Sequence, residues 1–351
     1  MSSDTMMNRQ VILVERPDGP IVDATFAIRE APLPALAEGE ALVRVAWLGI
    51  DATQRTWLND DETYIEPVPI GAVMRGSGVG QVVASRSERL PLGAWMYGTP
   101  GWQEYVVVRE ERANLLGLHP VPPVPGLDPK AMLSVYGVNG LTAYFGLVDI
   151  GGLPEDAAGK TVLVTGAAGG VGSIAGQIAR ACGARVIGVA GGPAKTAWIR
   201  EVARLAEAID YRAEDESSRL AELAPDGIDI VFDNVGGGML EAALDHLAPH
   251  ARVVLCGGIA SGYRRGQYGE TPRNLMNIAF RRARMEGYIF LDYVERFPEA
   301  LGRLLGWVQA GEIVWHEQVA FGLVAAPAAL QGLFEGRNLG KQLVRVWNPD
   351  A

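Results

Sequence analysis

The segment of residues 166–172, Gly-Ala-Ala-Gly-Gly-Val-Gly, constrains the fold more than any other part of this chain. It lies between an apolar run, Thr161–Thr165, and residues 173–182, whose apolar positions are spaced as in a helix. A second apolar run, Arg185–Ala190, follows. Glycine permits a tight turn that approaches a pyrophosphate, and the helix N-terminus supplies N–H donors. This order predicts a dinucleotide-binding unit; the alternative is a purely structural turn, since glycine-rich turns are common.

The alternation of strands and helices continues after this unit. Apolar runs at Ile228–Asp233 and 252–256 predict further strands, and a helical pattern at 131–148 precedes the glycine loop. Strands of this type separated by helices predict a parallel sheet with crossover helices. We therefore expect an α/β, doubly wound domain in this part of the chain.

The first third of the chain has a different pattern, typical of β structure. Residues 41–47, 78–84 and Tyr105–Arg109 predict short strands, with glycine and proline between them. A proline-rich connector at 120–125 suits a domain boundary. Residues 343–347 are strand-like again and could return the chain to the first domain.

Composition limits the partners and the compartment. A length of 351 residues suits two domains, and a net charge of −10 argues against nucleic acid as a partner. No stretch approaches the roughly 20 apolar residues of a membrane helix, and residues 1–10 do not resemble a signal peptide. The two cysteines, Cys182 and Cys256, lie in apolar contexts and are expected to be reduced. We expect a cytoplasmic enzyme with a small-molecule substrate, binding neither nucleic acid nor membrane.

The residues after the second strand of the dinucleotide unit indicate the cofactor. NAD enzymes usually place Asp or Glu there, where it binds the ribose 2′-hydroxyl. This chain has Gly191-Gly192 instead, followed by Lys195. Without a carboxylate and with a cation nearby, a 2′-phosphate is better accommodated, so NADPH is predicted. The alternative for Lys195 is a solvated residue in the first turn of a helix.

The histidine and cysteine positions argue against a metal. The histidines are His119, His246, His250 and His316, so the first 118 residues contain neither His nor Cys. Catalytic zinc is therefore not expected, and two cysteines cannot build a four-thiolate structural site. Neither a Tyr-x-x-x-Lys pair nor a serine nucleophile elbow is found. The interpretation that remains is hydride transfer by a bound cofactor.

Seven motifs in order resemble one family, the zinc-free medium-chain reductases. That family includes the leukotriene 12-hydroxydehydrogenase/15-oxoprostaglandin reductases, the plant alkenal double-bond reductases and the bacterial curcumin reductases. The resemblance covers nearly the whole chain. Besides the glycine loop, its markers are Val73-Met74-Arg75-Gly76, Gly101-Trp102-Gln103-Glu104-Tyr105, Gly140-Leu141-Thr142-Ala143-Tyr144, Phe232-Asp233-Asn234-Val235-Gly236-Gly237, Arg284-Met285-Glu286-Gly287 and Asn338-Leu339-Gly340-Lys341.

The resemblance implies an architecture and a reaction. A GroES-like, β-rich catalytic domain would comprise residues 1–130 and 311–351, around an inserted Rossmann NADP-binding domain at 131–310. Relatives are often homodimers joined along the Rossmann sheets, through an edge strand such as 252–256 or 288–291. The implied reaction is NADPH-dependent saturation of the αβ double bond of an enone or enal. The alternatives are a zinc-free NADPH quinone reductase and a non-catalytic NADP-binding sensor or scaffold.

The resemblance also implies cofactor contacts for particular residues. The pyrophosphate would lie against Gly169, Gly170, Val171 and Gly172. The adenosine phosphate would be held by Lys195 and Tyr211. The nicotinamide half would be lined by Asn234, Cys256, Gly257, Gly258, Ile259, Tyr288, Ile289, Phe290 and Asn338.

Two departures from the family pattern affect the expected substrate region. Relatives commonly carry Ile-Ser-x-Tyr-Asn after the Cys-Gly pair; here the tyrosine, Tyr263, comes one position late and is followed by Arg264. The Asp-Pro pair of many relatives is Asp51-Ala52. Reduction of an enone places negative charge on the carbonyl oxygen and a proton on the α-carbon. Tyr263 is the first candidate for the proton donor and Tyr64 the second; either tyrosine could instead only pack.

Overall fold

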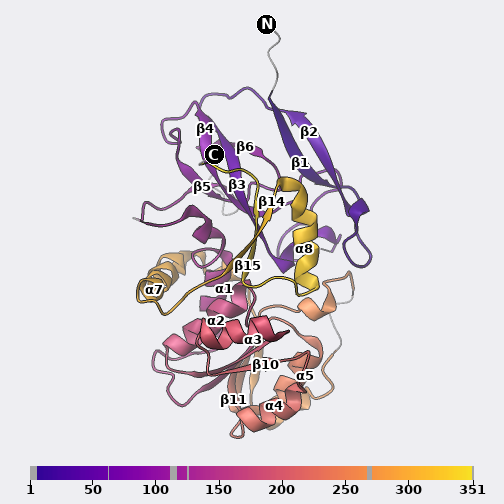
Figure 1. Ribbon diagram of the computed structural model, residues 1–351, viewed down its shortest axis with the longest axis vertical. Helices are drawn as coiled ribbons and strands as arrows, with labels where there is room; N and C mark the ends of the chain where they lie inside the picture. The colour runs from indigo at the N-terminus through magenta and orange to yellow at the C-terminus, as the bar shows by residue number, and fades with distance from the viewer. Residues whose placement is uncertain (1–5, 62, 111–116, 125, 267–270, 350–351) are drawn as a thin grey trace. The chain divides into compact units, whose positions relative to one another are not determined.

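The computed structural model describes residues 6–61, 63–110, 117–124, 126–266 and 271–349. The chain forms two compact units (Figure 1). Unit 1 comprises Met1–Leu133, Glu317–Arg337 and Gln342–Ala351, and unit 2 comprises Ser134–His316 and Asn338–Lys341. The chain therefore leaves unit 1 after Leu133, returns at Glu317, and re-enters unit 2 only for Asn338–Lys341.

Unit 1 is built mainly from antiparallel strands. A two-stranded sheet pairs β1 (Met7–Leu13) with β2 (Phe26–Pro32). The larger sheet has the order β14-β15-β3-β4-β5-β7, with β6 also paired to β3. Its strands are β3 (Glu40–Ile50), β4 (Ser77–Ser85), β5 (Trp95–Gly98), β6 (Tyr105–Arg109), β7 (His119–Pro120), β14 (Glu317–Phe321) and β15 (Lys341–Arg345). Among the described residues, unit 1 also contains helix α8 (Ala326–Phe334) and short 3-10 helices at Asp23–Thr25, Ala52–Leu58, Pro129–Leu133 and Leu323–Ala325.

The C-terminal strand β15 joins the larger sheet between β14 and β3. It runs antiparallel to β3, with Gln342 opposite Ile50 and Arg345 opposite Trp47. Leu343 and Val344 are both fully buried, so both faces of β15 are covered at this point. The strand expected at 343–347 is observed at Lys341–Arg345, and residues 342–351 are grouped with unit 1.

Unit 2 contains a six-stranded parallel sheet of order β10-β9-β8-β11-β12-β13. Its strands are β8 (Thr161–Thr165), β9 (Arg185–Ala190), β10 (Glu207–Asp210), β11 (Ile228–Asp233), β12 (Leu247–Leu255) and β13 (Arg284–Gly287). β8, β9 and β11 begin and end where the apolar runs of the sequence predict. These runs are almost continuously apolar because both faces of the sheet are covered by helices.

Helices cover the unit 2 sheet on two sides. Figure 1 draws α2 and α3 on one side of β10 and α4 and α5 on the other. Buried leucine, isoleucine and valine side chains of the strands, α4 and α5 form one continuous core. The helices of unit 2 are α1 (Val138–Phe145), α2 (Gly170–Ala181), α3 (Pro193–Glu201), α4 (Glu216–Leu223), α5 (Gly237–Asp245), α6 (Met276–Phe280) and α7 (Phe297–Gln309), with a π turn at Gly146–Ile150 and 3-10 turns at Ile259–Ser261 and Phe290–Arg296.

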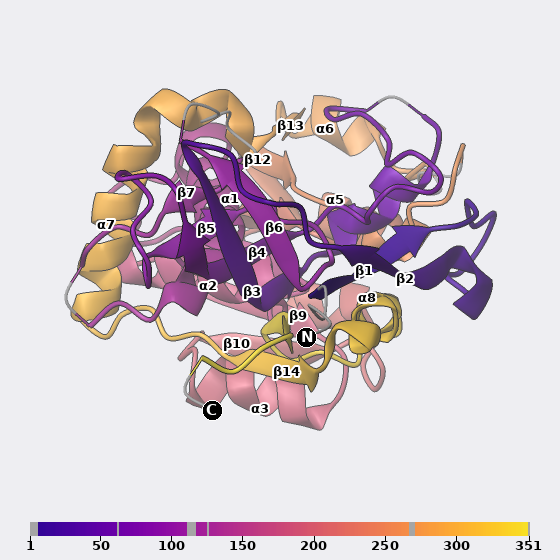
Figure 2. The ribbon, with the colours of Figure 1, turned by 90° about the horizontal axis from the view of Figure 1, so that it is seen from above.

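Three details of the sequence prediction are wrong. The helix expected at 131–148 is limited to α1, between a 3-10 turn and a π turn. Strand 252–256 is not an edge, since β12 pairs with β11 on one side and β13 on the other. Residues 288–291 are not a strand; the edge strand of the described sheet is β13, immediately before them (Figure 2). β13 escaped the prediction because Arg284 and Glu286 are exposed and break the apolar pattern.

The predicted fold class is confirmed: a β-rich unit accompanies a doubly wound, parallel-sheet α/β unit. Among the described residues, no helix is both long enough and apolar enough to cross a membrane.

Candidate functional site

The strand order of unit 2 defines where a ligand would bind. The chain leaves β8 toward β9 on one side, and leaves β11 toward β12 on the other, although β8 and β11 are neighbours. In open α/β sheets, the crevice outside the carboxyl ends of two such strands is the ligand site. The glycine loop follows β8 and residues 233–236 follow β11, so both segments lie at this point.

The glycine loop has the shape that its sequence predicts. Gly166 has a positive φ of 62°, and Gly169 is the N-cap of α2. A side chain at Gly172 would place its Cβ 2.3 Å from the carbonyl oxygen of Gly166. The loop is therefore closed against the first turn of α2, and only glycine fits at Gly172. The first amides of α2 have no acceptor within the helix and can bind an anion.

Asp233 is a fully buried carboxylate at the end of β11. Its Oδ1 accepts the hydroxyl proton of Thr165, the last residue of β8, at 2.6 Å. The amides of Val235 and Gly236 also donate to this carboxylate, at 3.1 Å and 3.0 Å. Burial raises the pKa of Asp233, while these hydrogen bonds oppose the rise. The carboxylate thus links the two strands that flank the crevice and shapes the turn between them.

Asn234 continues this link. Its backbone amide donates to Oγ1 of Thr165 at 2.8 Å, and its side-chain Nδ2 donates to the Thr165 carbonyl at 2.7 Å. The Asp233 carbonyl accepts the amides of Cys256 and Gly257 at 2.9 Å and 3.0 Å. The turn after β12 is therefore attached to the turn after β11.

Tyr263 lies against the turn that follows β12. The Gly258 amide donates to the Tyr263 hydroxyl at 2.7 Å, and a Cβ at Gly257 would lie 2.9 Å from that oxygen. Tyr263 has a positive φ of 49°, and its amide donates to Oγ of Ser261 at 3.0 Å. Ile259 is attached to the same region, since its amide donates to the Asn234 carbonyl at 3.3 Å. The structure thus brings four predicted nicotinamide-side residues and Tyr263 to one turn.

The side chains of Cys256 and Tyr288 face the interior of unit 2. The Tyr288 hydroxyl donates to the carbonyl of Thr142 in α1 at 2.6 Å, and a Cβ at Gly146 would lie 2.3 Å from it. Burial raises the pKa of the Cys256 thiol to about 12, so it stays protonated at neutral pH. Residues 289 and 290 follow, and the Phe290 ring stacks on Phe297 at 5.8 Å between centroids. The cofactor contacts expected for residues 288–290 stay predictions. They would be made by backbone atoms.

The segment that carries Asn338 lies beside the glycine loop. The Gly340 amide donates to the Ala168 carbonyl at 2.7 Å, and Gly340 and Gly169 form a parallel bridge. Asn338 Nδ2 donates to the Gly340 carbonyl at 3.0 Å, which holds the asparagine in this turn. The Asn338 segment and the glycine loop, about 170 positions apart in the sequence, are therefore neighbours in unit 2.

At the outer end of the crevice, Gly191 is covered by Tyr211. A Cβ at Gly191 would lie 2.7 Å from the Tyr211 hydroxyl oxygen. Lys195 is in the first turn of α3 and is partly buried, and burial lowers its pKa. Tyr211 thus lies at the glycine pair after β9, and Lys195 lies in the helix that begins immediately after that pair. The structure also adds Arg212, which the sequence prediction missed and whose Nε lies 2.8 Å from the same Cβ position.

Tyr64 belongs to unit 1, whereas Tyr263 belongs to unit 2. Tyr64 is 42% exposed. Its hydroxyl lies 2.6 Å from Oγ1 of Thr53 and accepts a hydrogen bond from Nε1 of Trp57 at 3.3 Å. It is a surface tyrosine that is held by its own domain. Its role as a proton donor stays a prediction.

Across the described ranges, no group of three or more His, Cys, Asp and Glu side chains is arranged to hold a metal ion.

Comparison with known proteins gives matches along the whole chain. Residues 9–116 match a family model described as the N-terminal domain of oxidoreductase, and residues 170–306 match one described as zinc-binding dehydrogenase. The NADPH-dependent curcumin reductase of Escherichia coli is 36% identical and covers 100% of both chains. The NADP(+)-dependent 2-alkenal reductase of Nicotiana tabacum is 34% identical over 98% of this chain and 99% of its own. The crystal structure of CurA from Vibrio vulnificus in complex with NADPH has a TM-score of 0.89 at 36% identity, covering 97% of this chain and 100% of that one.

Proposed function

We propose that this chain, which belongs to the zinc-free medium-chain dehydrogenase/reductase family, is an NADPH-dependent reductase of the carbon–carbon double bond of enones and enals. The observation that carries the proposal is full-length similarity to two double-bond reductases, curcumin reductase and 2-alkenal reductase. The crevice at the ends of β8 and β11 supports it, because its loops suit a dinucleotide.

The residues present fit NADPH. The first-turn amides at Gly170, Val171 and Gly172 would hold the pyrophosphate, where the closed loop leaves no room for a side chain at Gly172. Lys195 and Tyr211 would hold the 2′-phosphate beside Gly191, which offers no carboxylate to repel it. When bound, NADPH supplies the hydride that reaches the β-carbon of the substrate.

The other residues of the site would orient the cofactor and complete the proton transfer. Asn234 and Asn338 are fixed by hydrogen bonds within unit 2 and would line the nicotinamide half. We assign proton donation to Tyr263, because the Gly258 amide already donates to its oxygen. That hydrogen bond would stabilise the negative charge left on the phenol oxygen after it gives its proton to the substrate. Tyr64 is the second candidate.

The first prediction concerns the reaction. With NADPH and an enone such as a curcuminoid, or an enal such as a 2-alkenal, the product should be the saturated carbonyl compound. Deuterium from 4-deuterated NADPH should be found on the β-carbon by NMR and mass spectrometry, because the hydride adds there. Deuterium on the carbinol carbon of an allylic alcohol would contradict the proposal. So would turnover confined to quinones, which would identify a quinone reductase, or cofactor binding without turnover, which would identify a sensor or scaffold.

The second prediction concerns Tyr263. If this tyrosine donates the proton, Tyr263→Phe should lower kcat by roughly 100-fold or more while changing KM much less. Tyr64→Phe is the matched control and should lose only a few-fold in kcat. The reverse order of the two variants would transfer the role to Tyr64. A small loss in both would mean that the two tyrosines only pack.

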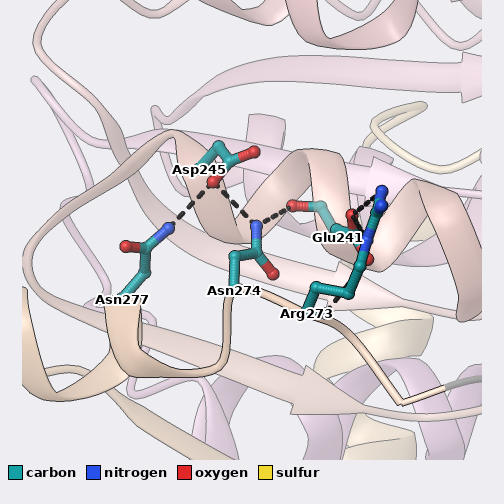
Figure 3. Close-up of polar contacts among 5 residues, drawn as sticks. All are labelled: Glu241, Asp245, Arg273, Asn274 and Asn277. Atoms are coloured by element: carbon teal, nitrogen blue, oxygen red, sulfur yellow. Dashed lines mark hydrogen bonds and ion pairs between the residues drawn. The ribbon is translucent and has the colours of Figure 1, made fainter.

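We also propose a homodimer that forms through the β13 edge. Helix α6 is drawn beside β13 in Figure 2, and Figure 3 shows how Asn277 of α6 and the preceding residues Arg273 and Asn274 contact α5. Arg273 binds the Glu241 carboxylate at 2.8 Å, and Asn274 and Asn277 donate to Oδ1 of Asp245 at 2.7 Å and 2.9 Å.

Two large apolar side chains of α6 are exposed. Met276 and Phe280 are 61% and 69% exposed, although they are large hydrophobic residues. An open strand edge beside exposed apolar side chains suits self-association about a two-fold axis. Such an arrangement would bury both features in a second copy of the chain.

The third prediction tests this interface. Phe280→Asp should convert a dimer into a monomer in analytical ultracentrifugation, because each copy would bury a charge. Leu92→Asp, at a unit 1 residue that is 67% exposed, should leave the dimer intact. A wild-type mass that equals the monomer at every concentration would reject the dimer. A Phe280→Asp variant that stays dimeric would place the interface elsewhere.

The two cysteines are free thiols, and together with the use of NADPH they support the proposal of a cytoplasmic enzyme.

A further inference from the structure

Arg212 and Gly191 lie side by side at the carboxyl end of the unit 2 sheet. β9 and β10 are parallel, with Asp210 opposite Ala190, so the residues that follow the two strands are neighbours. An imaginary Cβ on Gly191 would lie 2.8 Å from Nε of Arg212, and one on Gly192 would lie 4.0 Å from its Nη1. The guanidinium therefore extends over the backbone of this glycine pair.

Asp210 fixes this arrangement. Its Oδ1 accepts the amide of Gly192 at 2.7 Å and the amide of Arg212 at 3.0 Å. One carboxylate thus joins the loop after β9 to the loop after β10. Because the bond to Arg212 is made by its backbone, the position of this residue does not depend on its side chain.

The charges around Arg212 leave the guanidinium available to an anion. In the described part of the chain, Arg212 forms no ion pair, while the nearby Glu214 is paired with Arg219 at 2.8 Å. Lys195 is close enough for the charge of Arg212, together with burial, to lower its pKa. Two cations that repel each other therefore lie near one another at this end of the sheet, with Arg212 beside the Tyr211 hydroxyl. A dianionic group between them would remove that repulsion.

We propose that Arg212 is a second cationic ligand of the cofactor 2′-phosphate and sets the preference for NADPH over NADH. The inference rests on the proposed use of NADPH. A phosphate monoester offers oxygens to two cations, and a guanidinium binds them with two parallel N–H donors. Lys195 supplies a point charge from α3, and Arg212 supplies the planar contact from the opposite loop.

The test compares Arg212→Ala with Arg200→Ala, an exposed arginine on the same helix as Lys195 that leaves the same net charge. Dissociation constants are measured by calorimetry for NADPH, NADH, 2′,5′-ADP and 5′-AMP. Arg212→Ala should weaken NADPH and 2′,5′-ADP roughly tenfold or more. It should leave NADH and 5′-AMP within about twofold of the wild type, because neither carries a 2′-phosphate. Arg200→Ala should change none of the four constants by more than about twofold, and Arg212→Lys should restore part of the lost affinity.

Several results would overturn the inference, and they differ from those that overturn the proposed function. If wild type prefers NADPH but Arg212→Ala keeps that preference, Arg212 is not a ligand and only this inference fails. If Arg212→Ala weakens all four ligands equally, its role is structural. If the wild-type enzyme binds NADH as tightly as NADPH, the cofactor assignment itself is wrong.

Discussion

The carboxylate of Asp233 binds the hydroxyl of Thr165 inside the parallel sheet, where the two halves of the sheet meet. Taking a carboxylate out of water is costly, and this one is compensated by the hydroxyl and by the amides of Val235 and Gly236. The same four groups determine where β8 and β11 end. The crevice between these ends therefore depends on a hydrogen-bonded buried charge rather than on apolar packing alone.

This interaction reaches the nicotinamide and pyrophosphate parts of the proposed cofactor site through the backbone. The Asp233 carbonyl holds the Cys256 and Gly257 amides, so the turn that carries Tyr263 is placed by β11. Thr165 also leads into the glycine loop, and Ala168 in that loop accepts the Gly340 amide near Asn338. The turns that carry Asn234, Tyr263 and Asn338 are thus connected to one of the two central strands or to the glycine loop after β8, whereas Tyr288 is bonded to α1. A change at Asp233 or Thr165 would move several of these segments together.

Local patterns were enough to predict much of this structure. The glycine loop and the strands Thr161–Thr165, Arg185–Ala190 and Ile228–Asp233 follow from apolar runs and backbone freedom, which act within a few residues. The edge strand did not follow, because the polar residues of Arg284–Gly287 hide its pairing with β12. Arg212 was missed for a similar reason: its nearness to Gly191 exists only after two parallel strands have paired.

Thr165 and Asp233 do carry a local sequence signal, since each ends an apolar strand on a polar residue. Their neighbouring positions in the sheet depend on strand order, which no local pattern contains. Cys256 and Tyr288 show the opposite difficulty. Family resemblance placed them in the cofactor site, and their side chains face the interior of unit 2.

The Asp233–Thr165 interaction is the central claim about this site. A double-mutant cycle measures the coupling between the two residues directly. Dissociation constants for NADPH would be determined for Thr165→Val, Asp233→Asn and the double variant. We predict that each single change weakens NADPH, and that the double variant is about as weak as the weaker single variant. The coupling energy should then be about 1 kcal/mol or more, as expected for residues in one hydrogen-bond network. Losses that add to within about 0.5 kcal/mol would show that the two residues act independently and would contradict this account.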